Sequence, residues 1–179
     1  MTIPLCLGVD SQPSRIGLAL VTLHDDPEPV WADAFTLVRP GMTLGAAVAA
    51  AIRRADAEAD RAGADVVRVG IERAVIYGPN TSLETVWDSG GTYALAVYQC
   101  QRVWRGTRLT IVPLRVSQWK ARALGQGHGN DSKDQVAVWA RRWAKGAGWD
   151  EVRMNGLAAK DATDALGIAR GAAIERGPA

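Results

Sequence analysis

The sequence contains few of the residues that build disulfide frameworks and zinc sites. Its 179 residues include two cysteines, Cys6 and Cys100, and two histidines, His24 and His128. Both cysteines lie in apolar stretches, the histidines are far apart, and no metal-ligand spacing is present. We therefore expect two reduced thiols in the core of a cytoplasmic protein, with no disulfide and no zinc site.

Long hydrophobic runs are also missing. Charge or glycine interrupts every apolar stretch before the roughly 18 residues that a membrane-spanning helix needs, so we expect no membrane partner. The N-terminus lacks the basic region that opens a secretory signal, so none is expected. A hydrophobic content of 47% and a charged content of 22% are typical of globular proteins. The length suits one domain over residues 1–179 with a sizeable core.

Acidic side chains are scarce in one part of the chain. Between residues 101 and 145 the acids are Asp131 and Asp134 alone, whereas the rest of the chain is net acidic and the whole carries only +2. The ten basic residues of this segment are Arg102, Arg105, Arg108, Arg115, Lys120, Arg122, Lys133, Arg141, Arg142 and Lys145. Such an asymmetry is typical of a surface that faces a polyanion, although solvated helix faces are the alternative.

The apolar runs predict an α/β fold with five strands. The strands are expected at residues 3–9, 15–23, 30–38, 65–71 and 109–113. Helices are expected at residues 43–62, 81–103, from 117, from 132 to 146, and from 160. This order predicts a mixed sheet, with a three-stranded antiparallel meander followed by two parallel strands, and helices on both faces.

Two glycines stand in the middle of the second expected helix. Gly90 and Gly91 each cost roughly 1 kcal/mol relative to alanine at such a position. Their presence indicates the close approach of another backbone, such as that of a second subunit.

Four carboxylates form the pattern from which a chemistry can be argued. Asp10 is expected at the exposed end of the first strand, and Glu72 at the end of the fourth. Asp161 and Asp164, three residues apart, share one face of the last helix. Turn chemistry at Asp10 and the helix dipole at the last two are the plainer explanations. If the four converge they repel one another unless they hold cations, and hard oxygen donors select Mg²⁺ or Mn²⁺.

The same residues resemble a known family, the RuvC-type Holliday junction resolvases of the RNase H-like nuclease superfamily. The family's final motif, Asp-Ala-Ala-Asp-Ala-Leu-Ala-Ile-Ala, is nearly reproduced by Asp-Ala-Thr-Asp-Ala-Leu-Gly-Ile-Ala from Asp161 onward. The other matching segments are residues 7–17, 70–72 and 125–136. The resemblance implies an RNase H-like fold and a homodimer that resolves four-way DNA junctions. It would do so by paired symmetric nicks that leave 5′-phosphate and 3′-hydroxyl ends.

The resemblance also implies roles for individual residues. Asp10, Glu72, Asp161 and Asp164 take the positions of the ligands to two Mg²⁺ ions, for which Mn²⁺ can substitute. Lys133 takes the position of the family's catalytic lysine and contacts the scissile phosphate.

Further positions are assigned to DNA contact. Lys120 matches a second basic position of the family, and Arg73 and Arg122 are placed with it. The family's cellular enzymes have a phenylalanine wedge after the second acid, where this chain has Val75, so Tyr77 is the candidate wedge. The turn after Asp10 also departs from the family's Pro-Gly-Ser.

Alternatives remain open at this stage. The same fold and acids serve nucleases that cut other branched or flap DNA, or RNA. A junction-binding protein that does not cut is a further alternative, and the need for a branch-migration helicase is undetermined. The tryptophans allow two interpretations each: Trp119, Trp139 and Trp143 pack in the core or stack on bases. Composition suits a GC-rich genome or its phage, so the expected location is a bacterial cytoplasm or an infected host cell.

Overall fold

The computed structural model describes residues 2–38, 40–73, 83–106 and 108–174, with only the backbone described for 83–87. Its centre is a five-stranded sheet in the order β3-β2-β1-β4-β5. β1 pairs with β2 in antiparallel fashion and β2 with β3 likewise, whereas β4 is parallel to both β1 and β5. The strands are β1 (Ile3–Ser11), β2 (Arg15–Thr22), β3 (Pro29–Thr36), β4 (Ala64–Glu72) and β5 (Thr110–Leu114).

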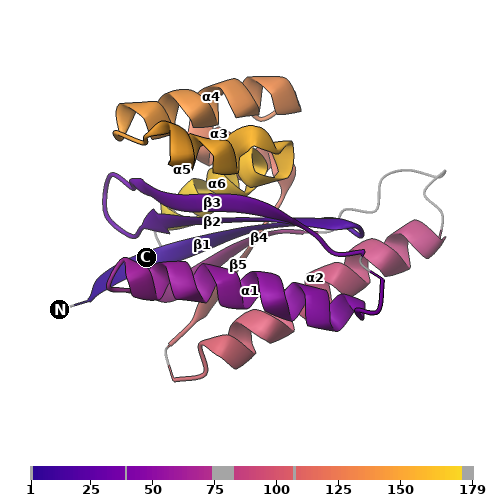
Figure 1. Ribbon diagram of the computed structural model, residues 1–179. Coiled ribbons are helices and arrows are strands. Elements are labelled where there is room, and N and C mark those ends of the chain that lie inside the picture. Colours follow the sequence, from indigo (N-terminus) through magenta and orange to yellow (C-terminus); the bar gives the residue numbers. More distant parts are fainter. Residues whose placement is uncertain (1, 39, 74–82, 107, 175–179) are drawn as a thin grey trace.

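Helices cover both faces of this sheet (Figure 1). α1 and α2 lie on one face, and α6 lies on the other with α3, α4 and α5 around it. The helices are α1 (Leu44–Arg61), α2 (Leu83–Val103), α3 (Val116–Leu124), α4 (Lys133–Gly146), α5 (Glu151–Asn155) and α6 (Lys160–Ala173), with a 3₁₀ turn η1 (Gly156–Ala158) before α6. The predicted architecture, a mixed five-stranded sheet between helices, is confirmed.

Strand alternation divides the hydrophobic core into two parts. Leu5, Leu7 and Val9 of β1 point to the core under α1 and α2, whereas Cys6 points to the core under α6. Both cysteines are free and buried, as expected from the sequence. Burial raises the pKa of each thiol to about 12, which leaves both in the unreactive protonated form.

Glycines on the α6 face allow the helix to lie directly on the strands. A Cβ atom added at Gly8 would be 2.0 Å from the carbonyl oxygen of Ala165, and one at Gly17 would be 2.0 Å from that of Asp161. A Cβ added at Gly70 of β4 would be 2.5 Å from the Cβ atom of Ala172 on α6. Larger residues at these positions would hold α6 away from the sheet, so the glycines set the depth at which its acidic first turn sits.

Some features differ from the sequence-based expectation. α5 and η1 were not predicted, because a five-residue helix is too short to show helical periodicity. Gly90 and Gly91 lie within α2, as predicted, and no other part of the described chain comes within 4 Å of a Cβ added at either. No helix among the described residues is long and apolar enough to cross a membrane.

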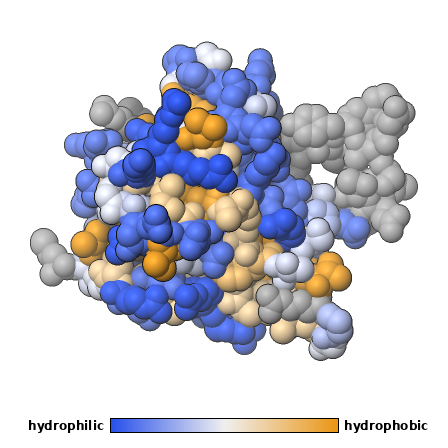
Figure 2. Space-filling view, turned by 45° about the horizontal axis from the view of Figure 1, so that its top comes forward, coloured by the Kyte–Doolittle hydropathy of each residue, from blue (hydrophilic) through white to orange (hydrophobic). Residues whose placement is uncertain are grey.

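Hydrophilic residues cover most of the face seen in Figure 2, and hydrophobic residues form a broken band across its middle. Among the described residues, exposed large hydrophobic side chains are few and scattered over several elements, including Tyr98 on α2 and Val138 on α4. Scattered exposure of this kind is normal for a globular surface.

Candidate active site

Two parallel strands place Asp10 and Glu72 next to each other. Gly8 pairs with Gly70 and Val9 with Ile71, so the acids occupy the next position along each strand. Adjacent strands are about 4.8 Å apart, and side chains two residues after a glycine face the same way as the missing glycine side chain. Both carboxylates therefore lie on the α6 face of the sheet, at the carboxyl ends of β1 and β4.

The first turn of α6 brings the other two acids to this place. Gly17, against which the Asp161 carbonyl packs, is the antiparallel register partner of Asp10. The Asp164 carboxylate, one turn further along α6, is buried and the Asp161 carboxylate is partly exposed. Asp10 itself is only 1% exposed, which corrects the expectation of an exposed strand end: α6 covers that end.

The pKa shifts show that three of the carboxylates interact. Burial, together with the charges of Glu72 and Asp164, raises the pKa of Asp10 to about 8 against the opposing effect of Lys133. The pKa of Glu72 is also raised, mainly by burial and in part by Asp164. Burial likewise raises the pKa of Asp164, although Lys133 counteracts it. Asp10, Glu72 and Asp164 thus share one poorly solvated, electrostatically coupled site.

Two cationic side chains balance part of this charge. Lys133 Nζ lies 3.2 Å from Asp164 Oδ2 and 3.9 Å from Asp161 Oδ1. Arg15 Nε lies 2.9 Å from Asp161 Oδ2. Burial by itself would lower the pKa of Lys133, but Asp164 and its neighbouring acids raise it, so the ammonium group stays protonated.

The donor set suits hard divalent cations. Asp10 Oδ2 and Asp164 Oδ1 are buried and have no hydrogen-bond partner, so each has a lone pair free to bind a cation. Among the described residues, no three His, Cys, Asp or Glu side chains are arranged as a finished metal site. The Asp161 carboxylate is in addition held by Arg15 and Lys133, whose side chains are about half exposed.

The predicted DNA contacts lie in different environments. Lys120 is buried, and its ammonium group donates to the carbonyl oxygen of Asp131 in the glycine-rich loop before α4. Arg122 is partly buried on the same helix, and Arg73 is exposed directly after Glu72. Tyr77, the candidate wedge, lies outside the described residues.

Two polar contacts to the acids were not predicted from the sequence. Gln12 Nε2 donates a 3.1 Å hydrogen bond to Asp10 Oδ1, and Trp119 Nε1 donates a 2.8 Å bond to Glu72 Oε2. A glutamine two residues after a strand-end aspartate is a signal that could have been used. No local signal links Trp119 to Glu72, because the two are 47 residues apart.

The two tryptophans of α4 form a separate cluster. Trp139 and Trp143 stack with ring centroids 5.3 Å apart, and the guanidinium carbon of Arg170 lies 4.6 Å from the Trp143 ring centroid. Both rings are partly buried and pack on the core beneath α6. This arrangement supports a packing role for the pair.

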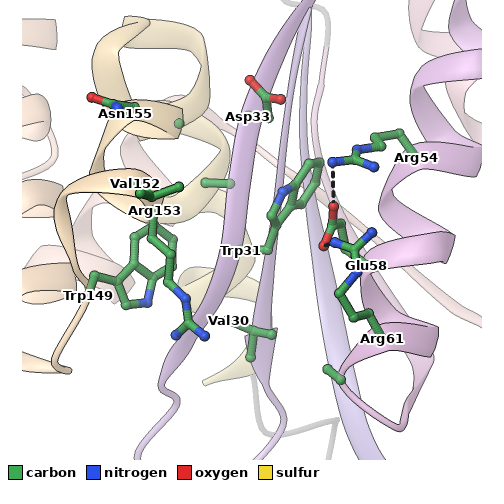
Figure 3. Close-up of a pocket in the computed structure, with 13 residues that line it drawn as sticks. Val30, Trp31, Asp33, Arg54, Glu58, Arg61, Trp149, Val152, Arg153 and Asn155 are labelled. Atoms are coloured by element: carbon green, nitrogen blue, oxygen red, sulfur yellow. Dashed lines mark hydrogen bonds and ion pairs between the residues drawn. The ribbon is translucent and has the colours of Figure 1, made fainter.

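A groove of about 580 Å³ lies away from the acids, across the free edge of β3 (Figure 3). Its walls are α1 on one side and the α5 region on the other, with Trp31 and Trp149 among the lining side chains. Arg54 and Arg61 both pair with Glu58 across α1. These three charged side chains of the groove are paired with one another, and we assign no chemistry to the groove.

The arrangement of strands and helices defines the fold class of the protein. A meander of three antiparallel strands, two further parallel strands and a terminal helix that brings acids to the ends of β1 and β4 make up the RNase H-like arrangement. No protein-family model matches the sequence, and no curated protein matches it.

Solved structures give the narrower comparison. RuvC of Thermus thermophilus in complex with a Holliday junction substrate superposes with a TM-score of 0.61 at 16% identity, covering 93% of this chain and 90% of that one. The yeast mitochondrial Holliday junction resolvase Ydc2 gives 0.60 at 12% identity, covering 97% and 79%. The fowlpox virus resolvase gives 0.50 at 9% identity, covering 94% of each. The chain therefore has the fold of the RuvC-type Holliday junction resolvases, as the resemblance predicted.

Proposed function

We propose that this protein is a divalent-metal-dependent DNA endonuclease that resolves four-way junctions. The observation that carries the proposal is the coupling of Asp10, Glu72 and Asp164 on one face of the sheet, with Lys133 beside them. The same fold is found in a RuvC whose structure contains a Holliday junction. Three coupled acids, of which Asp10 and Asp164 each have a buried oxygen without a hydrogen-bond partner, have little structural benefit, because their mutual repulsion destabilises the folded protein.

The proposed roles follow from the position of each group. Asp10, Glu72, Asp164 and, after release from Arg15, Asp161 would hold two Mg²⁺ ions. Bound Mg²⁺ supplies activation of water and charge stabilisation of the leaving oxygen in phosphodiester hydrolysis.

Lys133 has a half-exposed ammonium group at the rim of the acids. We propose that it exchanges its carboxylate partners for the scissile phosphate and stabilises negative charge there. The buried Lys120 holds the loop that leads to Lys133, and its contact with the Asp131 carbonyl favours this positioning role over a surface contact with DNA. Arg73 and Arg122 are the proposed contacts to phosphates.

We further propose a homodimer. A four-way junction has approximate two-fold symmetry, and two active sites related by a two-fold axis would make paired symmetric nicks. The products would carry 5′-phosphate and 3′-hydroxyl ends. Gly91, Ala94 and Tyr98 form an exposed line along α2, at positions three to four residues apart, and this is the proposed contact between subunits.

The test compares the native protein with Asp10→Asn on a mobile four-way junction in Mg²⁺. We expect the native protein to nick the junction and the variant to bind it without cutting. Three-way, flap and linear DNA and an RNA junction serve as competing substrates. Preference for one of these would replace the junction assignment, binding without any nicking would favour a non-cleaving protein, and an Asp10→Asn variant that cuts at the native rate would end the assignment.

A further inference from the structure

We infer that Trp119 is a positioning residue of the metal site, which fixes the carboxylate of Glu72 through its indole N–H. The inference rests on the proposed function for the identity of the site. The hydrogen bond from Nε1 to Oε2 is 2.8 Å long, and the tryptophan is only 1% exposed. It leaves the other oxygen of Glu72 available to a cation.

The indole ring is packed closely in this position. It lies against α6 where that helix has Gly167 and Gly171: a Cβ added at Gly167 would be 2.5 Å from the ring, and one at Gly171 would be 3.1 Å from the Trp119 side chain. The two glycines therefore form a slot on α6 that the side chain fills. Because Asp164 lies on the same helix, Trp119 fixes the distance between α6 and Glu72 as well as the direction of the carboxylate.

A second contact continues from Trp119 toward Lys133. The ammonium nitrogen of Lys120 lies 5.6 Å from the centroid of the Trp119 ring while it donates to the Asp131 carbonyl. α3 thus contacts Glu72 through Trp119 and contacts the loop before Lys133 through the adjacent Lys120. A shift of the ring would change the surroundings of both the acid and the lysine.

A buried indole N–H generally finds some hydrogen-bond acceptor. The evidence for a positioning role is therefore which acceptor the indole N–H of Trp119 has. Trp149, also buried, donates to the backbone carbonyl of Pro29, and Trp104 donates to Asp56 on α1, away from the acids. These two side chains show that the fold can satisfy an indole elsewhere. At Trp119 the acceptor is a carboxylate of the proposed ligand set, and groups that orient a metal ligand in this way commonly change metal affinity or activity by about 10–100-fold when removed.

The experiment uses Trp119→Phe, which keeps an aromatic ring in the slot and removes the N–H. Mn²⁺ binding is measured by titration calorimetry, and the Mg²⁺ dependence of junction nicking is measured in parallel. We expect about 10–100-fold weaker Mn²⁺ binding and a matching rise in the Mg²⁺ needed for half-maximal rate, with the rate recovered at saturating Mg²⁺. Trp104→Phe and Trp149→Phe, each of which removes a buried indole bond elsewhere, should bind Mn²⁺ as the native protein does.

Further measurements separate positioning from packing. In a Glu72→Gln background, Trp119→Phe should cause no additional loss of Mn²⁺ affinity, because the charge it orients is gone. The native protein gives a test that needs no variant at Trp119: its indole NMR signal should move on Mg²⁺ titration while those of Trp104 and Trp149 stay fixed. Native Mn²⁺ affinity in Trp119→Phe, or an unmoved Trp119 signal in a protein that binds Mg²⁺, overturns the inference but not the proposed function. A protein that binds Mn²⁺ but cuts no junction overturns the proposed function and leaves the positioning role measurable.

Discussion

Gly8 of β1 and Gly70 of β4 are register partners in adjacent parallel strands, and both face α6. Each is followed two residues later by an acid, so the chain repeats the pattern glycine, apolar residue, carboxylate at the same level of two neighbouring strands. The glycines let α6 approach the sheet, and the carboxylates meet its acidic first turn. The close packing and the acid cluster are thus two results of one sequence pattern.

The first prediction is that Gly8→Ala destabilises the protein. The added methyl group would lie 2.0 Å from the Ala165 carbonyl oxygen, so either α6 or β1 must move. Overpacking of this kind costs about 1–3 kcal/mol or more in the free energy of unfolding, which urea denaturation measures. Gly146→Ala on α4, where nothing lies within 4 Å, is the matched control and should leave stability unchanged or slightly increased. Equal stability of the two variants would contradict the packing argument.

The sequence was sufficient for the strands and for the acid positions because both depend on short-range patterns. Alternation and apolar runs identify strands, and the order of strands and helices along the chain favours the mixed arrangement of antiparallel and parallel pairs. The burial of Asp10 could not be predicted from short-range patterns. The turn residues beside it indicate exposure, whereas the helix that covers it, α6, begins about 150 residues later. The bond from Trp119 to Glu72 and the salt bridge from Lys133 to Asp164 have the same origin: they depend on how α3, α4 and α6 pack, which local patterns do not encode.

The second prediction concerns the pH dependence of stability without metal. Burial, followed by the charges of Glu72 and Asp164, raises the pKa of Asp10 to about 8, whereas an aspartate in an unfolded chain titrates near pH 4. Between about pH 4 and 8 the folded protein keeps a proton that the unfolded chain has lost, so stability falls as pH rises through this range. Asp10→Asn has no such proton and should lose less stability.

Thermal unfolding in EDTA at a series of pH values measures this effect. At pH 8.5 the Asp10→Asn variant should be more stable than the native protein by about 1 kcal/mol or more, and the difference should shrink toward pH 4. Added Mg²⁺ should stabilise the native protein more than the variant. Asp65→Asn, at an exposed position of β4, is the control. If the stability of the native protein and that of Asp10→Asn changed with pH in the same way, the pKa of Asp10 would be the same in the folded and unfolded chains, which contradicts the prediction.

The third prediction is that Lys133→Ala separates cutting from binding. Its ammonium group lies 3.2 Å from Asp164 and is the proposed contact to the scissile phosphate. Removal should lower the nicking rate by about 10²–10³-fold, as for other groups that stabilise transition-state charge, while junction affinity falls only slightly. Lys160→Ala is a matched control, since Lys160 precedes Asp161 on α6 but pairs with the exposed Asp134. Single-turnover nicking and gel-shift binding give the two readouts, and an equal loss in both variants would refute a specific role for Lys133.

The fourth prediction places the dimer contact on α2. Tyr98 is 53% exposed, and Gly91 and Ala94 precede it on the same side of the helix, so a second α2 could approach closely along this line. Tyr98→Glu would introduce a charge into that contact. We expect it to shift the protein from dimer to monomer in sedimentation equilibrium and to replace paired nicks with single, unpaired ones, because each active site remains intact. Val138→Glu, which charges an exposed hydrophobic position on α4, should leave the dimer in place. A Tyr98→Glu protein that stays dimeric would show that the subunits meet at another surface, because a buried carboxylate without a partner is not tolerated at an interface of this kind.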